Sequence, residues 1–375
     1  MKRLFCLLMV LSLMLVGCGK TAPEAAPAAP TAAPTEAPTE APTEAPTEAP
    51  TEAPTEAPTE APTEPPEPHN PLTGEPLEEF YTGRPVAFTI NNVSAALPQY
   101  GLNELDWMFE AETEGGITRC VGIIADPSSV GTVGPIRSAR SYFLNLSVSY
   151  NAPLFHCGAS DFANEKWYAF EQTVPSWDHV DQMGNGGKYF YRDSRGGGYA
   201  TEHTLFTNGE RMAKAMEELG FNPTGNEPVF YGYQFSEEVV LNGQSANTVS
   251  IEFDKGKNTT MKYDAESGMY LAYQNGSSWI DGTVWDNAAF RNVLVIAAEQ
   301  EMRQGGKYVH SFYELSGSGD GWLAVDGQMI PVKWHHEGVE GPFRFTLADG
   351  TTPITLGIGS TYCAIVNVDC PVEAE

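Results

Sequence analysis

The folded part of this chain is predicted to belong to the α+β class, with a mixed α/β N-terminal unit and a β-rich, antiparallel C-terminal unit. The first half alternates β-prone runs with helical patterns, whereas the second half consists of short β-prone runs separated by Asn-Gly and Asp-Gly turns. We therefore expect four regions: a lipoprotein signal peptide (1–17), a disordered tether (18–68), an α+β domain (69–226) and a β-rich domain (227–375).

Two strand signals define the start of the α+β domain. Val86–Asn91 is an apolar run that predicts a strand ending in Asn91-Asn92. The β-prone segments 107–114 and 117–125 flank Gly115-Gly116, and glycines between two such segments predict a β-hairpin.

Two helices are predicted further along the α+β domain. Apolar residues at 139, 142, 143, 146 and 150 follow the helical period, which predicts a helix over 137–150 with Pro135 near its start. The sequence Thr207-Asn208-Gly209-Glu210 has the form of a capping box, and it predicts a second helix that ends at Gly220.

The β-rich domain is predicted from its turns, because no helical pattern follows residue 225. Turn dipeptides at this density between β-prone runs favour an antiparallel sheet or a small barrel. The dipeptides are Asn242-Gly243, Asn275-Gly276, Asp326-Gly327 and Asp349-Gly350.

The N-terminus has the features of a lipoprotein leader. Lys2 and Arg3 precede an apolar stretch, residues 4–16, that is shorter than the about 20 residues a membrane-spanning helix needs. The stretch ends at Leu15-Val16-Gly17-Cys18, which has the form of a bacterial lipobox. These features predict lipidation of Cys18, attachment to the cell membrane by the lipid anchor only, and a location on the extracytoplasmic face.

A low-complexity repeat follows the leader. Eight consecutive Ala-Pro-Thr-Glu units occupy residues 33–64, and such a segment has almost nothing apolar to bury, so we expect an extended, disordered spacer. The whole chain carries a net charge of −28, which argues against binding to nucleic acid or anionic lipid through its overall field. Clustered arginines are an exception to this negative charge and therefore indicate where an anion could bind.

Four cysteines follow Cys18 in the sequence. An exported protein with four cysteines can form two disulfides, but apolar runs also hold buried free thiols, so the redox state stays open. The four are Cys120, Cys157, Cys363 and Cys370.

The strongest local signal for a ligand is the segment from Gly134 to Arg140. If a helix begins near Arg137, its free N–H groups and the guanidinium groups of Arg137 and Arg140 point the same way, and both favour anions. Ser138 lies between the two arginines. Something acidic is expected there, either an internal carboxylate or an anionic ligand.

Several motifs together resemble the YerB-like lipoproteins of Gram-positive bacteria. The resemblance covers residues 70 to about 370 and implies an α+β N-terminal unit and a β-rich C-terminal one, without implying a reaction. The motifs are Asn70-Pro71-Leu72-Thr73-Gly74, Arg84-Pro85, Asn91-Asn92, Glu114-Gly115-Gly116-Ile117-Thr118-Arg119, Gly134–Arg140, Arg192-Asp193 with His203, and Gly317-Ser318-Gly319.

A second cluster raises the question of catalysis. Cys157 or Ser160 with His203 and Asp193 would supply a nucleophile, a base and an orienting acid. The sequence around Ser160 lacks the Gly-x-Ser-x-Gly elbow of α/β hydrolases. Whether the protein is an enzyme stays open.

The sequence thus favours a non-catalytic binding lipoprotein over its rival, a cell-envelope hydrolase or transferase that uses Cys157 or Ser160 with His203. The expected partner is an anionic wall or envelope ligand, or a membrane or envelope protein; no nucleic acid, metal or cofactor is expected. The residues predicted to bind the ligand are Arg119, Arg137, Ser138, Arg140, Arg192, Asp193 and His203.

Overall fold

Strands are the main regular element of this structure, a computed structural model that describes residues 67–221, 229–254, 256–305 and 307–375. The α-helices of the described residues are α1 (Ser141–Ser149), α2 (Asp161–Thr173) and α3 (Gly209–Glu218). No helix in these ranges has the length and apolar character to cross a membrane. The predicted signal peptide, the lipidation site Cys18 and the repeat lie outside the described residues.

The first half of the body holds eight strands besides the helices. They are β1 (Val86–Asn91), β2 (Trp107–Glu112), β3 (Thr118–Ile124), β4 (Thr132–Val133), β5 (Leu154–His156), β6 (His179–Asp181), β7 (Tyr191–Arg192) and β8 (Leu205–Asn208). Short 3-10 helices occur at Ser94–Ala96, Leu102–Glu104, Pro127–Ser129, Gly187–Tyr189 and Thr201–His203.

In the second half, strands are the only regular elements of the described residues. They are β9 (Gln234–Ser236), β10 (Gln244–Ser245), β11 (Thr248–Asp254), β12 (Lys257–Asp264), β13 (Met269–Gln274), β14 (Ser277–Ser278), β15 (Ile280–Asp281), β16 (Asp286–Asn287), β17 (Ala289–Phe290), β18 (Asn292–Ala298), β19 (Gln300–Gly305), β20 (Tyr308–Tyr313), β21 (Gly317–Val325), β22 (Gln328–His336), β23 (Arg344–Leu347), β24 (Thr355–Gly357), β25 (Thr361–Asn367) and β26 (Val372–Ala374).

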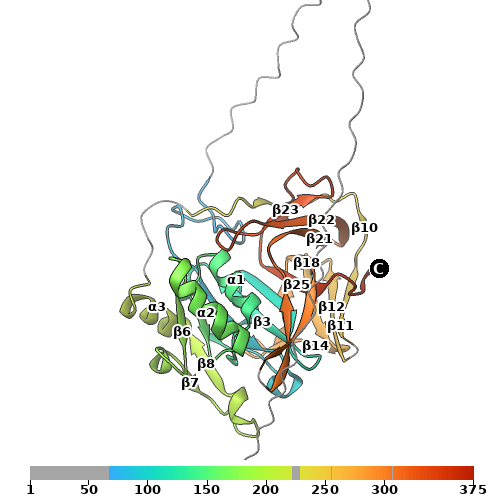
Figure 1. The fold of residues 1–375 in the computed structure, drawn as a ribbon. Helices are drawn as coiled ribbons and strands as arrows, with labels where there is room; N and C mark the ends of the chain where they lie inside the picture. The colour runs from blue at the N-terminus through green and yellow to red at the C-terminus, as the bar shows by residue number, and fades with distance from the viewer. Residues whose placement is uncertain (1–66, 222–228, 255, 306) are drawn as a thin grey trace, which may run out of the picture. The chain divides into compact units, whose positions relative to one another are not determined.

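The largest sheet contains strands from both halves of the sequence. Its order is β10-β22-β21-β18-β25-β2-β3-β1-β5-β6, with β23 beside β22. Strand β25 joins the halves, because it pairs in parallel with β18 on one side and with β2 on the other. In Figure 1 the red and orange strands of the second half accordingly lie against the cyan strands of the first. The division into two domains at residue 226 stays a prediction.

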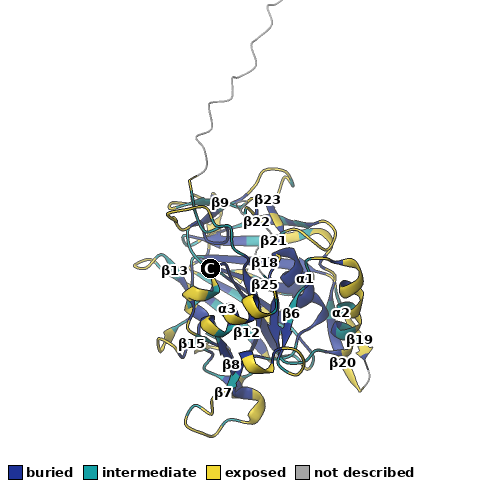
Figure 2. Ribbon diagram, turned by 90° about the vertical axis from the view of Figure 1, so that its left-hand side faces the viewer, coloured by how far each residue is buried: buried dark blue, intermediate teal, exposed yellow. Residues whose placement is uncertain are grey.

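Each face of this sheet packs against a different layer, because successive side chains of a strand point to opposite faces. On β2, Trp107, Phe109 and Ala111 belong to the core that includes α1 and α2. Met108 belongs to a second core shared with the smaller sheet β14-β13-β12-β11-β26. Every residue of α1 is buried, whereas α3 presents an exposed face (Figure 2).

The predicted strand and hairpin are confirmed. β1 has the expected bounds, and β2 pairs antiparallel with β3, with Trp107 opposite Ile123. Gly115 and Gly116 turn the chain at φ values of 78° and 68°, a left-handed conformation that favours glycine.

The prediction of a helix over 137–150 is wrong at its N-terminal end, since α1 begins only at Ser141. The preceding residues are extended because their backbone groups bond to other segments. Ile136 N donates to Leu205 O, and Ala139 N donates to Gly158 O. Pro135 therefore lies outside the helix, in an extended segment.

The second predicted helix is confirmed, with a different cap. α3 is capped by Asn208, whose side chain accepts from Arg211 N, while Thr207 Oγ1 donates to Tyr189 O. Gly220 follows the helix at φ 74°, as expected of a C-terminal glycine.

The second half is β-rich as predicted, but it is not purely antiparallel. The pairs β18–β25 and β24–β9 are parallel, and parallel partners arise from long connections that turn dipeptides cannot indicate. Asn275-Gly276 and Asp326-Gly327 do form hairpin turns, with positive φ at both positions. Cys120, Cys157, Cys363 and Cys370 are all free thiols.

Candidate functional site

Three parallel strands end side by side at one edge of the large sheet. β1 pairs in parallel with β5, and β5 pairs in parallel with β6. α2 begins at this edge, shortly after β5 ends, and the extended segment before α1 crosses it through a bridge between Ile90 and Ile136. In open α/β sheets, ligands bind beyond the carboxyl ends of such strands.

Arg140 is held by an internal carboxylate. Its Nε donates to Glu114 Oε2 at 2.9 Å, its Nη2 bonds to Glu114 Oε1, and its Nη1 donates to Ala139 O at 2.8 Å. Burial alone would raise the pKa of Glu114, but the hydrogen bonds and charge of Arg140 outweigh burial and lower it to about 2. Arg140 thus pairs with an internal carboxylate, that of Glu114, and not with an anionic ligand.

Arg119 is a buried cation whose hydrogen bonds are incomplete. Its side chain lies on the α1 face of β3 and donates from Nη1 to Ser138 O at 2.8 Å. Its Nε is buried without a partner, and only 3% of the residue is exposed. Burial and the repulsion from Arg140 and Arg137 lower the pKa of Arg119 to about 9. The attraction of Glu114 opposes this shift but does not outweigh it.

Arg137 forms no ion pair with any described residue. Its side chain is half-buried, and its Nε also lacks a hydrogen-bond partner. Its backbone is fixed, because Arg137 O accepts from Cys157 N at 3.0 Å and from the hydroxyl of Thr89. The charge of Arg137 acts on both Cys157 and His203, so its guanidinium lies near these two residues.

His203 lies at the same edge through a contact with β1. Its Nδ1 accepts from Asn91 Nδ2 at 2.9 Å, which leaves the ring proton on Nε2. Burial lowers the pKa of His203. The charges of Arg137 and Arg195 lower it further, whereas the charge of Glu202 opposes the shift. His203 is thus neutral at neutral pH and can offer one N–H donor.

Arg192 and Asp193 make only local contacts. Arg192 is exposed and donates to Thr201 O at 2.5 Å. Its positive charge acts to lower the pKa of the Cys157 thiol. Asp193 accepts from Arg195 N at 2.7 Å within the following turn. The structure therefore gathers Arg119, Arg137 and Ser138 with His203, and leaves Asp193 in a turn of its own.

No hydrogen bond between described residues assembles the nucleophilic triad considered from the sequence. Ser160 Oγ caps α2 by accepting from Ala163 N, and Cys157 Sγ donates to Gln182 Oε1 at 3.3 Å. Burial, with a further contribution from Asp181, raises the pKa of Cys157 even though Arg192 and Arg137 oppose the shift. A thiol with a raised pKa is a poor nucleophile at neutral pH.

The described residues contain no cluster of three or more His, Cys, Asp or Glu side chains suited to a metal ion. The nearest approach is a histidine pair, in which His156 Nε2 lies 3.1 Å from His179 Nδ1. Trp177 stacks on His179 with ring centroids 5.5 Å apart, and Trp167 meets the same ring edge-on, so aromatic groups enclose the pair.

The other face of the sheet holds a buried polar network around Glu110 that sequence reasoning missed. Glu110 shares the face of Met108 and lies between the large sheet and β12, where 0% of it is exposed. Lys257 Nζ lies 3.0 Å from Glu110 Oε1 and donates to Gln274 Oε1 at 2.6 Å. Glu110 further accepts hydrogen bonds from Asn92 Nδ2 (2.9 Å), Thr118 Oγ1 (2.5 Å), Thr259 Oγ1 (3.0 Å) and Tyr362 OH (2.6 Å).

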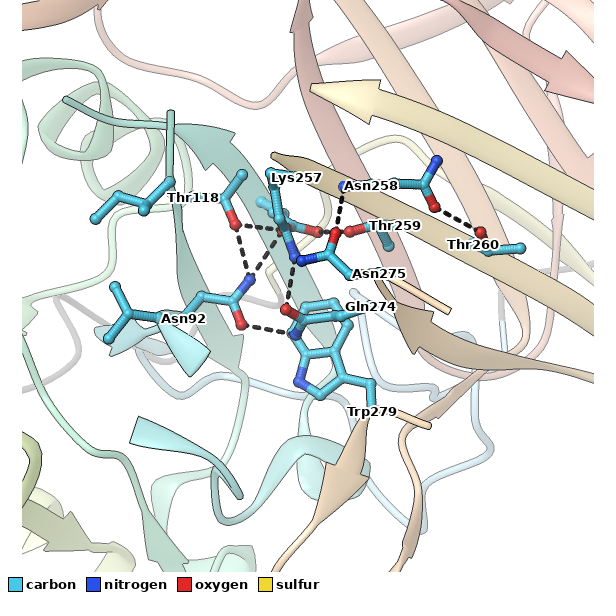
Figure 3. A network of polar contacts seen from close by, with 12 residues as sticks. Asn92, Thr118, Lys257, Asn258, Thr259, Thr260, Gln274, Asn275 and Trp279 are labelled. Atoms are coloured by element: carbon cyan, nitrogen blue, oxygen red, sulfur yellow. Dashed lines mark hydrogen bonds and ion pairs between the residues drawn. The ribbon is translucent and has the colours of Figure 1, made fainter. Parts of the chain in front are cut away.

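Figure 3 shows how this network joins the two halves of the sequence, with Asn92 and Thr118 on one side and Lys257, Gln274 and Trp279 on the other. A signal for it existed in the sequence. A carboxylate within the apolar run Trp107-Met108-Phe109-Glu110-Ala111 requires a buried partner, because buried carboxylates are almost always paired.

Comparison with known proteins places the chain in a family. Residues 72–222 match the N-terminal domain, and residues 249–363 the C-terminal domain, of a family of proteins of unknown function, DUF3048. The chain belongs to the DUF3048 family, and the two matches cover most of it.

The resemblance to YerB-like proteins is confirmed. The chain is 27% identical over 281 residues to YerB, a candidate lipoprotein of Bacillus subtilis (strain 168), covering 70% of this chain and 80% of YerB. The crystal structure of YerB from Bacillus subtilis superimposes with a TM-score of 0.68 at 26% identity, covering 81% of this chain and 99% of that one.

Proposed function

We propose that this protein is a membrane-anchored lipoprotein of the extracytoplasmic face that binds an anionic group of an envelope ligand without transforming it. The site is the strand edge formed by Arg119, Arg137, Ser138 and His203. Two observations support the anchor: the lipobox at Cys18 and the similarity to a candidate lipoprotein.

The observation that carries the binding proposal is the surplus of positive charge at the edge. Arg119, Arg137 and Arg140 interact electrostatically, yet Glu114 is the one carboxylate among the charged groups that act on Arg119. In a chain of net charge −28, the unpartnered Nε atoms of Arg119 and Arg137 at this edge are conspicuous. An anion bound beside Arg137 would neutralise this charge and accept hydrogen bonds from its guanidinium group.

Replacing Arg137 by alanine is expected to weaken binding of an anionic probe at least about 10-fold, because a hydrogen bond to a charged group contributes about 1.5–3 kcal/mol. The measurement is calorimetric titration of the full chain with inorganic phosphate and with citrate at constant ionic strength. The two probes distinguish a phosphate-binding site from a carboxylate-binding site.

The matched control for Arg137→Ala is Arg344→Ala. Arg344 lies on β23 with 60% of its side chain exposed, so its loss changes the net charge equally without touching the strand edge. Unchanged affinity in Arg137→Ala, or equal losses in both variants, would show that anions bind elsewhere or only through the overall charge.

The rival enzymatic function makes an opposite prediction for Cys157. Because burial raises the pKa of this thiol, its alkylation by iodoacetamide is expected to accelerate only above about pH 8.5, the range of an ordinary cysteine. The rate should be insensitive to His203→Ala. A reactive thiolate below pH 7 that disappears in His203→Ala would favour the hydrolase or transferase. Peptide mapping separates Cys157 from the other three cysteines.

A further inference from the structure

The ammonium group of Lys257 faces a side-chain amide in a place closed to solvent. Lys257 and Gln274 are 5% and 9% exposed, and Lys257 Nζ lies 2.6 Å from Gln274 Oε1. The indole of Trp279, which is fully buried, lies with its centroid 5.2 Å from the same Nζ. An amine, an amide and a carboxylate, that of Glu110, thus share one desolvated site.

Neighbouring contacts hold the amide in a fixed orientation. Gln274 Nε2 donates to Asn92 Oδ1 at 2.7 Å, so the carbonyl oxygen points toward Lys257 and the NH2 group points away. The backbone is fixed as well, because β12 and β13 pair with Thr259 opposite Gln274. Groups held side by side react with effective concentrations of about 10⁵–10⁸ M when the reacting atoms, here Lys257 Nζ and Gln274 Cδ, are well aligned.

We propose that Lys257 and Gln274 form an intramolecular amide cross-link after the chain folds, with Glu110 as the proton acceptor. Lys257 transfers one proton to Glu110, and the neutral Nζ attacks Gln274 Cδ. The bond from Cδ to Nε2 breaks, Nε2 takes up the second proton of Nζ, and ammonia leaves. Glu110 then releases its proton to the ammonia, so the products are an amide and an ammonium ion. No oxidant, cofactor or second substrate is consumed.

For Lys257, the buried surroundings favour the neutral amide product over the starting ion pair with Glu110. Burial of an ammonium ion is costly, and formation of the amide removes that charge from the desolvated site. The new amide keeps an N–H that can donate to Glu110 in place of the ammonium. Four neutral groups also donate hydrogen bonds to Glu110, so the cross-link is expected to form slowly, but one turnover in the life of the chain is sufficient.

The cross-link would tie together neighbouring strands of the smaller sheet, beside the contacts that this sheet makes with Glu110 of the large one. It would also be the first covalent cross-link among the described residues, whose four cysteines are free thiols.

Peptide mapping of the full chain tests the proposal. Trypsin cannot cleave after an acylated lysine, so residues 256–262 are expected to remain one peptide joined to residues 263–291. The joined species should be about 17 Da lighter than the sum of its two parts, which is the mass of the ammonia released by amide formation. Recovery of peptides 258–262 and 263–291 separately and in full yield from folded protein would overturn the proposal.

Three variants complete the experiment. Lys257→Arg keeps a cation beside Glu110 but removes the nucleophile, so the joined peptide should vanish. Lys262→Arg, at an exposed position of the same strand, should leave it unchanged. Glu110→Gln should slow its formation about 100-fold, the contribution typical of a general base. A joined peptide that persists in Lys257→Arg would assign the linkage to another lysine and overturn the proposal.

Discussion

Replacing Glu110 by leucine is expected to lower the free energy of unfolding by about 3–5 kcal/mol, the largest effect of any single substitution considered for this protein. Leucine fills a similar volume but removes both carboxylate oxygens. Lys257 then keeps a buried charge without its counter-ion, and the hydroxyl of Tyr362 loses its acceptor. Each such group retains the full cost of desolvation.

Urea denaturation of Glu110→Leu, monitored by tryptophan fluorescence, measures this loss. The control is Glu301→Leu on β19, where 65% of the side chain is exposed and the ion pair with Arg303 is at the surface; its effect should stay within about 1 kcal/mol. The double variant Glu110→Leu with Lys257→Met should recover part of the loss, because no unpaired charge remains. A loss below about 1 kcal/mol in the single variant would show that water reaches the network.

The second large effect is a loss of stability in acid that depends on Glu114. Since the folded protein lowers the pKa of Glu114 from 4.5 to about 2, the carboxylate stabilises the fold by about 3 kcal/mol above pH 4.5. This contribution falls as the pH drops from about 4.5 through 2, and it is lost below about pH 2, where the carboxyl is protonated in both the folded and the unfolded chain.

Glu114→Gln isolates the contribution of this carboxylate. The variant should be less stable than the parent at pH 7, and the two should converge near pH 2 in urea denaturation curves recorded across the range. The same variant should bind phosphate or citrate more tightly at pH 7, because Arg140 loses its internal partner. A parallel pH dependence in parent and variant would contradict the role assigned to the Arg140–Glu114 pair.

Local signals in the sequence were sufficient where structure depends on neighbours along the chain. The hairpin around Gly115-Gly116 and the end of α3 at Gly220 depend on positive φ at glycine, which the residue type reveals directly. The extended conformation before α1 was missed because its cause is remote: Leu205 and Gly158 supply the backbone acceptors.

The candidate site was predictable in part for the same reason. Arg137, Ser138 and Arg140 are adjacent in sequence, so their common location needed no fold. Which arginine is paired depends on the fold, because Glu114 binds Arg140 and leaves Arg137 Nε without a partner. The need of Glu110 for buried partners could be recognised, but their identity could not, since they include residues on strands as distant in sequence as β12 and β25.

The position of β25 also sets the order in which the protein can be completed. The strand at the middle of the large sheet is synthesised after both of its neighbours, yet β2 and β18 both need it for pairing. Until it arrives, β2 has an open edge and Glu110 lacks the hydroxyl of Tyr362. Pairings between such distant segments form slowly, so the nascent chain carries an open sheet edge until β25 has been synthesised. A chain cut short before residue 361 would keep its helices and hairpins in sequence but would have no strand to unite them.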